Sequence, residues 1–314
     1  MIKRTIDISS GPARLRIELD QLVIAREGHN DARVPTEDMG VLLIDQRDTV
    51  YTHSAMTRLM EKGACVVLCG DDHLPCGLLL PMEANELLTA RLRKQIGISR
   101  PLEKRLWRQV IRAKIAAQAV NLAALPLPSP EAAKLKAMVQ HVSSGDATNM
   151  EAQAARIYWP ALFGSAFRRE RGGAWPNPAL NYGYMIVRAA VARAIAGAGL
   201  HPAFGIHHHN RGNAFCLADD LMEPLRPLVD ATVFGLLGAV PDEGRPEVTP
   251  TVKRRLLSLL ARDVELAGQQ GPLMVQLHRM AAGLWSCYVG GAETLVLPTY
   301  DTTDLTAGPS NADI

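Results

Sequence analysis

Cysteine is scarce in this 314-residue sequence, and its number is odd. The five cysteines lie in mostly apolar surroundings and are Cys65, Cys69, Cys76, Cys216 and Cys287. The paired CxxC knuckles that indicate a structural zinc site are absent. This pattern excludes a small disulfide-stabilised secreted domain and favours free thiols in a reducing compartment, so we expect a cytoplasmic protein.

A long hydrophobic run is also lacking. The most apolar stretch, residues 187–204, is interrupted by two arginines and a histidine. It therefore falls short of the roughly 18 uninterrupted apolar residues that a membrane span needs. The first residues do not form a signal peptide, because charged side chains interrupt them from the third residue onward. We expect neither secretion nor association with a membrane.

Excess charge of either sign is small, since the formal net charge is +2. Any surface for a polyanion must therefore come from local clustering of basic residues. Several catalytic motifs are missing as well: there is no Gly-rich loop followed by Lys and Ser or Thr, no GxSxG and no HExxH. NTPases, serine hydrolases of the GxSxG type and common zinc proteases are not supported.

The hydrophobic pattern divides the chain into two parts. Up to about residue 80, short apolar runs between turn residues predict strands, with one helix near residues 54–62. From there on, apolar residues recur at helical spacing, and Pro and Gly clusters divide the region into six or seven helices. We predict an α+β fold with a β-rich domain over residues 1–82, a larger all-α catalytic domain over residues 83–298 and a disordered tail over residues 299–314.

Basic residues gather in one predicted helical segment. Between Arg91 and Lys114, nine Lys or Arg residues stand against one acid, Glu103. Such a surface attracts a phosphate backbone, because each contact releases condensed counterions. The same pattern is also typical of a solvated helix face. A second basic cluster at residues 168–171 favours a polyanion as the partner.

The densest polar constellation combines histidines and carboxylates. Residues 207–210 read HHHN, and Asp219, Asp220 and Glu223 follow them. On one helix Asp220 and Glu223 would share a face, so both could point at one Mg²⁺ or Mn²⁺ ion. The same pattern also arises without a metal, when acids in the first turn of a helix are stabilised by the helix dipole and the histidines form a surface loop. The spacing does not show which of the histidines would be a ligand. Glu151, among small and aromatic residues, is either a cap-region acid or an inward-facing ligand.

Three segments in order resemble the CRISPR-associated adaptation integrases, the first-numbered of the Cas proteins. They are GDATNMEAQAARIYWPALFG, NPALNYGYMIVRAAVARAIAGAGLHPAFGIHHHN and FCLADDLMEPLRPLVD. The segments VPTEDMGVLLID and KGACVVLCGDDHLPCG in the β-rich region, and WRQVIRAKIAAQA in the basic segment, resemble the family as well. The likeness covers nearly all of the chain to about Pro298. The sequence motifs are most similar to those of the type II branch.

The resemblance implies a metal site that holds Mg²⁺ or Mn²⁺. Position by position, the family's ligands fall on Glu151, on His208 in the Gly-x-x-His pattern that begins at Gly205, and on Glu223 or its neighbour Asp220. Other branches often have Asp where this chain has Glu223, a difference that preserves a carboxylate.

Further residues of the resemblance surround this site. Four match the motif around it and either support the ligands, contact DNA or simply pack: Asn177, Asn181, Tyr182 and Tyr184. The candidate phosphate contacts are basic side chains of the two clusters, namely Arg91, Arg93, Lys94, Arg105, Arg108, Arg112, Lys114, Arg168 and Arg169.

The implied function is metal-dependent DNA cleavage and integration in CRISPR adaptation. The 3′-hydroxyls of a short captured DNA would attack the two ends of a CRISPR repeat, and water in the same position would give a nick. Two attacks need two sites, so the resemblance implies a homodimer arranged with a small companion adaptation protein on double-stranded DNA, with dimer or partner contacts in the β-rich domain. The alternatives are a general metallonuclease of DNA repair and a non-catalytic DNA-binding assembly subunit.

Overall fold

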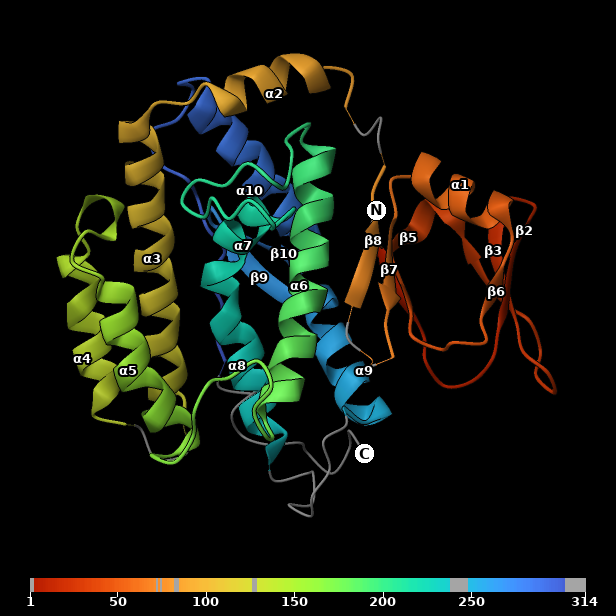
Figure 1. The fold of residues 1–314 in the computed structure, drawn as a ribbon, viewed down its shortest axis with the longest axis horizontal. Coiled ribbons are helices and arrows are strands. Elements are labelled where there is room, and N and C mark those ends of the chain that lie inside the picture. The colour runs from red at the N-terminus through yellow and green to blue at the C-terminus, as the bar shows by residue number, and fades with distance from the viewer. Residues whose placement is uncertain are drawn as a thin grey trace.

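The computed structural model describes residues 3–71, 73, 75–81, 85–125, 129–237 and 248–302. Most strands lie before residue 80 and the helical region follows, which confirms the α+β class. Figure 1 shows the strand-rich part on one side of the molecule and the helices on the other. The predicted boundary after residue 82 falls between strand β8 and helix α2, and residues 82–84 themselves lie outside the described ranges.

Two four-stranded sheets form the N-terminal part. The first has the order β1-β5-β7-β8, with parallel pairs except for the antiparallel β7 and β8. The second has the order β4-β3-β2-β6. Their strands are β1 (Arg4–Ile8), β2 (Arg14–Glu18), β3 (Gln21–Ala25), β4 (Ala32–Pro35), β5 (Met39–Ile44), β6 (Val50–Tyr51), β7 (Cys65–Cys69) and β8 (Pro75–Leu79).

Strand β5 shows why the sequence folds in this way. All its residues are buried, as expected of a central strand in a sheet covered on both faces. Leu42 and Ile44 belong to the core between the two sheets, whereas Val41 and Leu43 belong to the core shared with the helices. The first sheet therefore joins the two parts of the molecule.

The single helix expected in the β-rich region is confirmed as α1 (His53–Glu61). The Thr52 side chain caps it by accepting a hydrogen bond from the backbone N–H of Ala55 at 3.2 Å. Gly63 follows with a φ of +72°, a backbone conformation that glycine adopts without steric cost.

The C-terminal part contains nine described α-helices rather than six or seven, because some predicted helices are split. They are α2 (Leu88–Ile96), α3 (Arg100–Ala123), α4 (Glu131–Met138), α5 (Met150–Phe163), α6 (Asn177–Gly197), α7 (Cys216–Met222), α8 (Arg226–Gly235), α9 (Pro250–Ser258) and α10 (Leu273–Tyr288). Short 3₁₀ turns are η1 (Thr36–Asp38), η2 (Val139–His141), η3 (Ser144–Asp146), η4 (Glu223–Leu225) and η6 (Leu259–Ala261). Within the described chain, none of the helices is both long and apolar enough to cross a membrane.

Helix α6 lies at the centre of the larger core. It packs against α7, α8, α9 and α10 and also contacts β7 and β8 (Figure 1). Most of its residues are buried, so nearly every face of the helix has a neighbour. Helix α3 packs against α4, α5 and α8 on another side. A long helix buried on many sides explains why the apolar residues of this segment are nearly continuous in the sequence.

Two findings differ from the sequence prediction. A hairpin of β9 (Asp263–Leu266) and β10 (Gln269–Pro272) lies in the region expected to be all α. Its two-residue turn is Ala267-Gly268, and both residues have positive φ.

The predicted disordered tail over residues 299–314 is also wrong in its first residues. Thr299 pairs with Glu265 of β9, and the Tyr300 hydroxyl donates to the Pro224 carbonyl at 2.6 Å. Residues 303–314 lie outside the described chain.

Candidate active site

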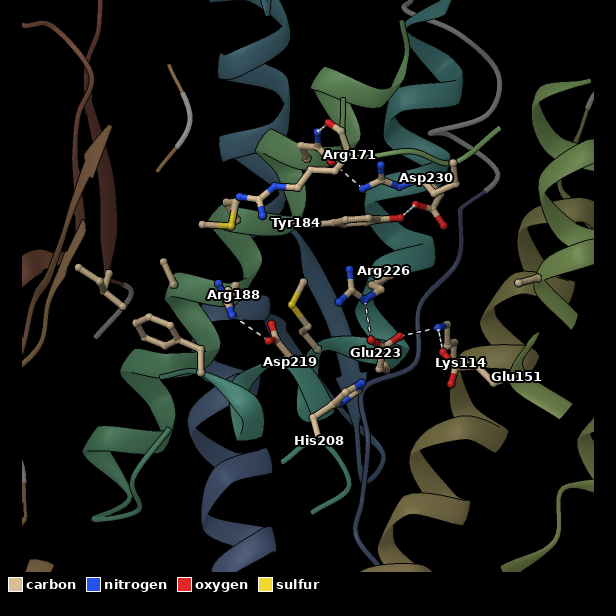
Figure 2. Close-up of a pocket in the computed structure, with 18 of the residues that line it drawn as sticks. Lys114, Glu151, Arg171, Tyr184, Arg188, His208, Asp219, Glu223, Arg226 and Asp230 are labelled. Carbon is tan, nitrogen blue, oxygen red and sulfur yellow. Dashed lines mark hydrogen bonds and ion pairs between the residues drawn. The ribbon is translucent and has the colours of Figure 1, made fainter. Parts of the chain in front are cut away.

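A cavity of about 940 Å³ lies between the helices and the edge strand β8 of the first sheet. It is lined by α3, α5, α6 and α7, by η4 and α8, and by the loops that precede α6 and α7. Figure 2 shows that charged side chains from these separate elements point into it. Its principal polar side chains are Lys114, Glu151, Arg169, Arg171, Asn181, Tyr184, Arg188, His208, Asp219, Glu223, Arg226 and Asp230.

Glu151 reaches the cavity from the first turn of α5. The Asn149 side chain caps this helix from a left-handed backbone conformation, with φ of 54°. The Asp146 carboxylate accepts hydrogen bonds from the backbone N–H groups of Met150 and Glu151 at 2.8 and 3.0 Å. These two acceptors satisfy the free N–H groups of the helix start, so the Glu151 side chain is left for the cavity, where it is about one-third exposed (32%).

Glu223 reaches the same place from the 3₁₀ turn η4, and its side chain is buried. Two cations hold it: the Arg226 Nε lies 2.8 Å from its Oε1, and the Lys114 Nζ lies 2.5 Å from its Oε2. Lys114 Nζ is also 2.5 Å from Oε1 of Glu151, so one ammonium group bridges two carboxylates (Figure 2). Burial acts to raise the pKa of Glu223, but Arg226 and Lys114 outweigh it and lower that pKa to about 2.

The histidine run divides into three different environments. The His207 ring stacks on Trp107, with centroids 4.2 Å apart, and burial lowers the pKa of His207. The exposed His209 lies 3.4 Å from an Arg100 nitrogen. His208 alone of the three lines the cavity, and Figure 2 shows its imidazole pointing towards Glu223. Of the three histidines, His208 is therefore the one that shares the cavity with Glu151 and Glu223.

Asp220 fixes the backbone and the ring of His208. Its Oδ2 accepts from the N–H groups of Ile206 and His207 at 2.6 and 2.8 Å, and its Oδ1 lies 2.5 Å from His208 Nδ1. This contact with Asp220, opposed in part by burial, raises the pKa of His208. Because Nδ1 is occupied, Nε2 is the ring nitrogen available to a ligand. A Cβ at Gly205 would lie 2.8 Å from Asp220 Oδ2, which explains glycine at that position.

The sequence predicted that Asp220 and Glu223 point at one ion. This prediction is wrong for Asp220, which does not face the cavity. Asp220 is fully buried, and it is not among the residues that line the cavity. Helix α7 ends at Met222, and the chain continues as the turn η4 with Pro224 in it, so the two acids do not continue on one helix face. The three backbone N–H groups and the imidazole around Asp220 use the hydrogen-bonding capacity of its carboxylate.

Tyr184 and Asp230 line another side of the cavity, and the fully buried Tyr158, which is outside the lining, contacts Asp230. The hydroxyl of Tyr158 donates to Asp230 Oδ2 at 3.1 Å, and the hydroxyl of Tyr184 donates to Oδ1. Burial raises the pKa of Asp230 to about 7, although the two phenols act against this shift. The guanidinium groups of Arg226 and Arg169 lie 4.7 and 5.2 Å from the centre of the Tyr184 ring.

The motif residues on α6 serve different purposes. Asn177 holds the loop before α6, because its side chain bonds to the backbone of Arg168, Glu170 and Ala174. Asn181 lines the cavity and accepts from Arg169 at 2.7 Å. Tyr184 also lines the cavity, as described above.

Tyr182 does not line the cavity. Its ring lies 5.8 Å from the Lys253 ammonium. Lys253 is itself ion-paired with the buried Asp45 of the N-terminal part. Tyr182 and Tyr184 stand two positions apart on α6, so they face different sides of the helix.

The predicted phosphate contacts divide into exposed and engaged side chains. Four are exposed on the surfaces of α2 and α3: Arg93, Lys94, Arg105 and Arg108. Arg168 is also exposed, and Arg112 is partly buried and donates to Gln140 at 3.0 Å. Arg169 is partly buried and belongs to the cavity wall.

Two of these side chains make contacts inside the fold, and their contacts with DNA remain predictions. Arg91 donates to the Ala198 carbonyl at 2.6 Å, and its guanidinium lies 4.7 Å from the centre of the Trp285 ring. It is therefore a packing residue between α2 and the helical core. Lys114 has only 12% of its side chain exposed and is bound to Glu151 and Glu223, so it is not part of the outer surface of α3.

Three charged cavity residues escaped the sequence analysis: Arg188, Arg226 and Asp230. Arg188 donates to Asp219 at 2.8 Å and lies over the Phe215 ring at 4.8 Å. Arg226 could have been found from its position three residues after Glu223. Asp230 carried no such signal, because its partners are tyrosines from α5 and α6.

The side chains can be tested for their fit to a metal ion. In the ranges that the structure describes, no group of three or more His, Cys, Asp or Glu side chains is close enough to hold one. The ammonium group of Lys114 stands between the two glutamates. Glu223 Oε2 is buried and has no hydrogen bond of proper geometry, and the Nε2 of His208 is available. Two carboxylates and an imidazole that line the same cavity are suitable donors for Mg²⁺ or Mn²⁺.

Comparison with known proteins supports the resemblance. A family model described as CRISPR associated protein Cas1 matches residues 7–240. A protein from Neisseria meningitidis serogroup C (strain 8013), named CRISPR-associated endonuclease Cas1, is 38% identical over 285 residues, which are 90% of this chain and 91% of that protein.

Two solved structures show the same fold at low sequence identity. A casposase bound to integration product superimposes with a TM-score of 0.76 at 20% identity, over 96% of this chain and 93% of that one. A chain of a Cas6-RT-Cas1–Cas2 complex gives a TM-score of 0.74 at 17% identity, over 94% of this chain and 36% of that one. The family model and the Neisseria relative each span most of the sequence, and the chain therefore belongs to the Cas1 family of CRISPR-associated proteins.

Proposed function

We propose that this chain is a divalent-metal-dependent DNA endonuclease and integrase that inserts short captured DNA into a CRISPR repeat array. The observation that carries the proposal is the convergence of Glu151, His208 and Glu223 from three separate elements on one cavity. Membership of a family whose Neisseria relative is named an endonuclease supports the nuclease part. The fold shared with a casposase bound to integration product supports the integrase part.

Glu151, His208 and Glu223 are the proposed ligands of Mg²⁺ or Mn²⁺. The ion would polarise the scissile phosphate and stabilise the negative charge that develops during in-line displacement. Asp220 holds His208 through Nδ1, so that Nε2 faces the cavity. Arg226 keeps Glu223 ionised and in place. These residues supply a fixed anionic donor set before any substrate enters.

The arginines of the cavity wall would bind the phosphates of the DNA. Arg169, Arg171 and Arg188 line the same space as the acids, and the guanidinium group suits phosphate oxygens. In strand transfer the attacking 3′-hydroxyl oxygen loses its proton to solvent and forms a bond to phosphorus. The bond to the leaving 3′-oxygen of the target strand breaks, and that oxygen takes up a proton from solvent. With water as the nucleophile, the same displacement gives a nick.

The proposed assembly is a homodimer with a small companion adaptation protein on double-stranded DNA, acting in the cytoplasm. One of the solved structures that share the fold is a Cas6-RT-Cas1–Cas2 complex, which supports a companion of this kind. Exposed Arg93, Lys94, Arg105 and Arg108 are the proposed outer phosphate contacts. Dimer or partner contacts are proposed for the N-terminal sheets.

The test is integration of a short duplex with free 3′-hydroxyls into a supercoiled plasmid that carries a repeat. The reaction contains the companion protein and either Mg²⁺ or Mn²⁺, and products are separated on gels. We expect joined product from the wild type and none from Glu151→Ala or His208→Ala. The matched controls are Glu131→Ala and His141→Ala, because both residues lie outside the cavity at the two ends of the α4 region.

Each alternative has its own result in this assay. Joining by Glu151→Ala and His208→Ala would show that the ligand assignment is wrong. Metal-dependent nicking without joining would favour a general nuclease of DNA repair. DNA binding with neither nicking nor joining, and no metal bound, would favour a non-catalytic assembly subunit.

A further inference from the structure

Lys114 occupies a position that is unusual for a lysine on a basic helix. Its ammonium lies 2.5 Å from both Glu151 Oε1 and Glu223 Oε2, and only 12% of its side chain is exposed. The ammonium group of a lysine carries a positive charge at neutral pH. A single positive charge therefore binds two of the three proposed metal ligands.

This position is the one that a metal ion would take between the same oxygens. A divalent cation and an ammonium group cannot share it, because like charges a few ångströms apart repel strongly in a partly buried site. Among the described side chains, no three metal-ligating groups lie close enough for a metal, and the ammonium group of Lys114 lies between the two glutamates. Glu223 would remain paired if Lys114 left, since Arg226 binds its other oxygen at 2.8 Å.

The surroundings of Lys114 leave a direction in which it can move. Lys114 lines the cavity, and the open space there is bounded by the arginines of the wall. A lysine has a compact ammonium on a flexible four-carbon stem, so it can change partners by rotating its side chain. Arg226 differs, because its guanidinium is held between Glu223 and the Tyr184 ring.

We propose that Lys114 holds the two glutamates together until the metal ion binds, and that it then turns into the cavity to contact a substrate phosphate. This inference rests on the proposed function, because it needs a metal held by Glu151 and Glu223. Lys114 would then be both a competitor of the ion and a catalytic residue. The sequence assignment of Lys114 as a phosphate contact would then hold for the metal-bound protein.

The competition is tested by titrating the full-length protein with Mn²⁺ in a calorimeter, without DNA. Lys114→Met keeps the length of the side chain and removes its charge, and Lys134→Met on α4 is the matched control. We expect Lys114→Met to bind Mn²⁺ about tenfold more tightly than the wild type, and the control to bind as the wild type does. Equal or weaker binding by a folded Lys114→Met would overturn the competition.

The movement is tested by the rate of reductive methylation at each lysine, read by mass spectrometry with and without Mn²⁺. Lys114 should react slowly in the metal-free protein and several times faster with Mn²⁺, whereas the exposed Lys134 serves as the internal reference. Unchanged protection of Lys114 at saturating Mn²⁺ would overturn the movement.

The contact with phosphate is tested by strand joining at saturating Mn²⁺, where a difference in metal affinity no longer matters. We expect Lys114→Met to join DNA about 10- to 100-fold more slowly, as for the loss of one charged transition-state contact, and Lys114→Arg to recover part of the rate. A full rate in Lys114→Met would overturn the catalytic role. Failure of the wild type and of Lys114→Met alike to bind Mn²⁺ would overturn the proposed metal site itself, whereas equal affinities would overturn only the competition by Lys114.

Discussion

Two buried carboxyl groups of the same cavity have pKa values that are shifted in opposite directions. Glu223 and Asp230 are only 4% and 1% exposed, and Figure 2 shows them on opposite sides of Arg226. Burial raises the pKa of both, as it does for any acid removed from water. At Glu223 the cations Arg226 and Lys114 reverse the shift and bring the pKa to about 2. At Asp230 the hydroxyls of Tyr184 and Tyr158 do not, and its pKa is about 7.

The difference teaches what kind of partner keeps a buried acid ionised. A phenol hydrogen bond stabilises a carboxylate less than a cation in direct contact does. The side with Glu223 therefore keeps negative charge that another cation can use, and it is the side with Glu151 and His208. The side with Asp230 builds structure instead, because its partner Tyr184 places a ring against the Arg226 guanidinium.

The largest effect should come from removing the charge of Glu223. Glu223→Gln leaves Arg226 and Lys114 buried beside a neutral amide, so we expect a loss of about 3 kcal/mol in the free energy of unfolding. Strand joining should fall by at least about a thousandfold, since a proposed ligand is lost. Urea unfolding and the gel assay measure the two effects. Glu265→Gln, on the β9 hairpin outside the lining of the cavity, is the control. Unfolding of the two variants at the same urea concentration would contradict the prediction.

A third buried carboxylate sharpens the comparison, because backbone N–H groups hold it. Asp220→Asn keeps the size of the side chain but gives it an N–H₂ group that faces three backbone donors and His208. We expect His208 to lose its orientation and Mn²⁺ affinity to fall about 10- to 100-fold, as for other supports of metal-binding histidines. Calorimetric titration measures this change. Asp219→Asn, at the neighbouring position, is the control. It tests whether the loss of any negative charge on this part of α7 lowers the Mn²⁺ affinity as much.

Much of the fold was predictable, because its elements follow from local patterns. The strands up to residue 80, helix α1 and the long helices have apolar residues at the expected period. The β9 hairpin was missed because Ala267-Gly268 is not one of the common turn sequences of a hairpin. The start of the C-terminal segment, residues 299–302, was missed because polar composition does not show that a tyrosine will reach a carbonyl of η4.

The sequence named two acids and one histidine of the cavity, but it predicted neither Asp230 nor the contacts of the cations. Family resemblance pointed to Glu151, His208 and Glu223, and the structure brings these three to one cavity. Lys114 was assigned to an outer surface because its neighbours on α3 are basic. Its partners come from α5 and η4, and no periodicity within α3 can show them.

The Asp230 side can be tested through the pH dependence of stability. Its pKa of about 7 in the folded protein exceeds its ordinary value of 3.8, so the folded state binds a proton that the unfolded chain has lost. The resulting stabilisation is complete below pH 3.8 and disappears as the pH rises through 7. Asp230→Asn lacks this titration, so from pH 4 to 7 it should gain on the order of 3 kcal/mol relative to the wild type. Urea unfolding of both proteins at several pH values measures the difference, and parallel profiles would show that Asp230 does not titrate in this range.

The smallest effect should come from Tyr184→Phe, which separates the two functions of this tyrosine. The variant loses the hydroxyl that donates to Asp230 but keeps the ring that lies 4.7 Å from Arg226. We expect a loss of about 1 kcal/mol in the free energy of unfolding and an unchanged rate of strand joining. Tyr184→Leu removes the ring as well, so Arg226 should hold Glu223 less firmly and joining should fall a few fold. Equal rates of joining in the two variants would show that the two sides of the cavity are independent, because the ring is the link that this comparison assigns to them.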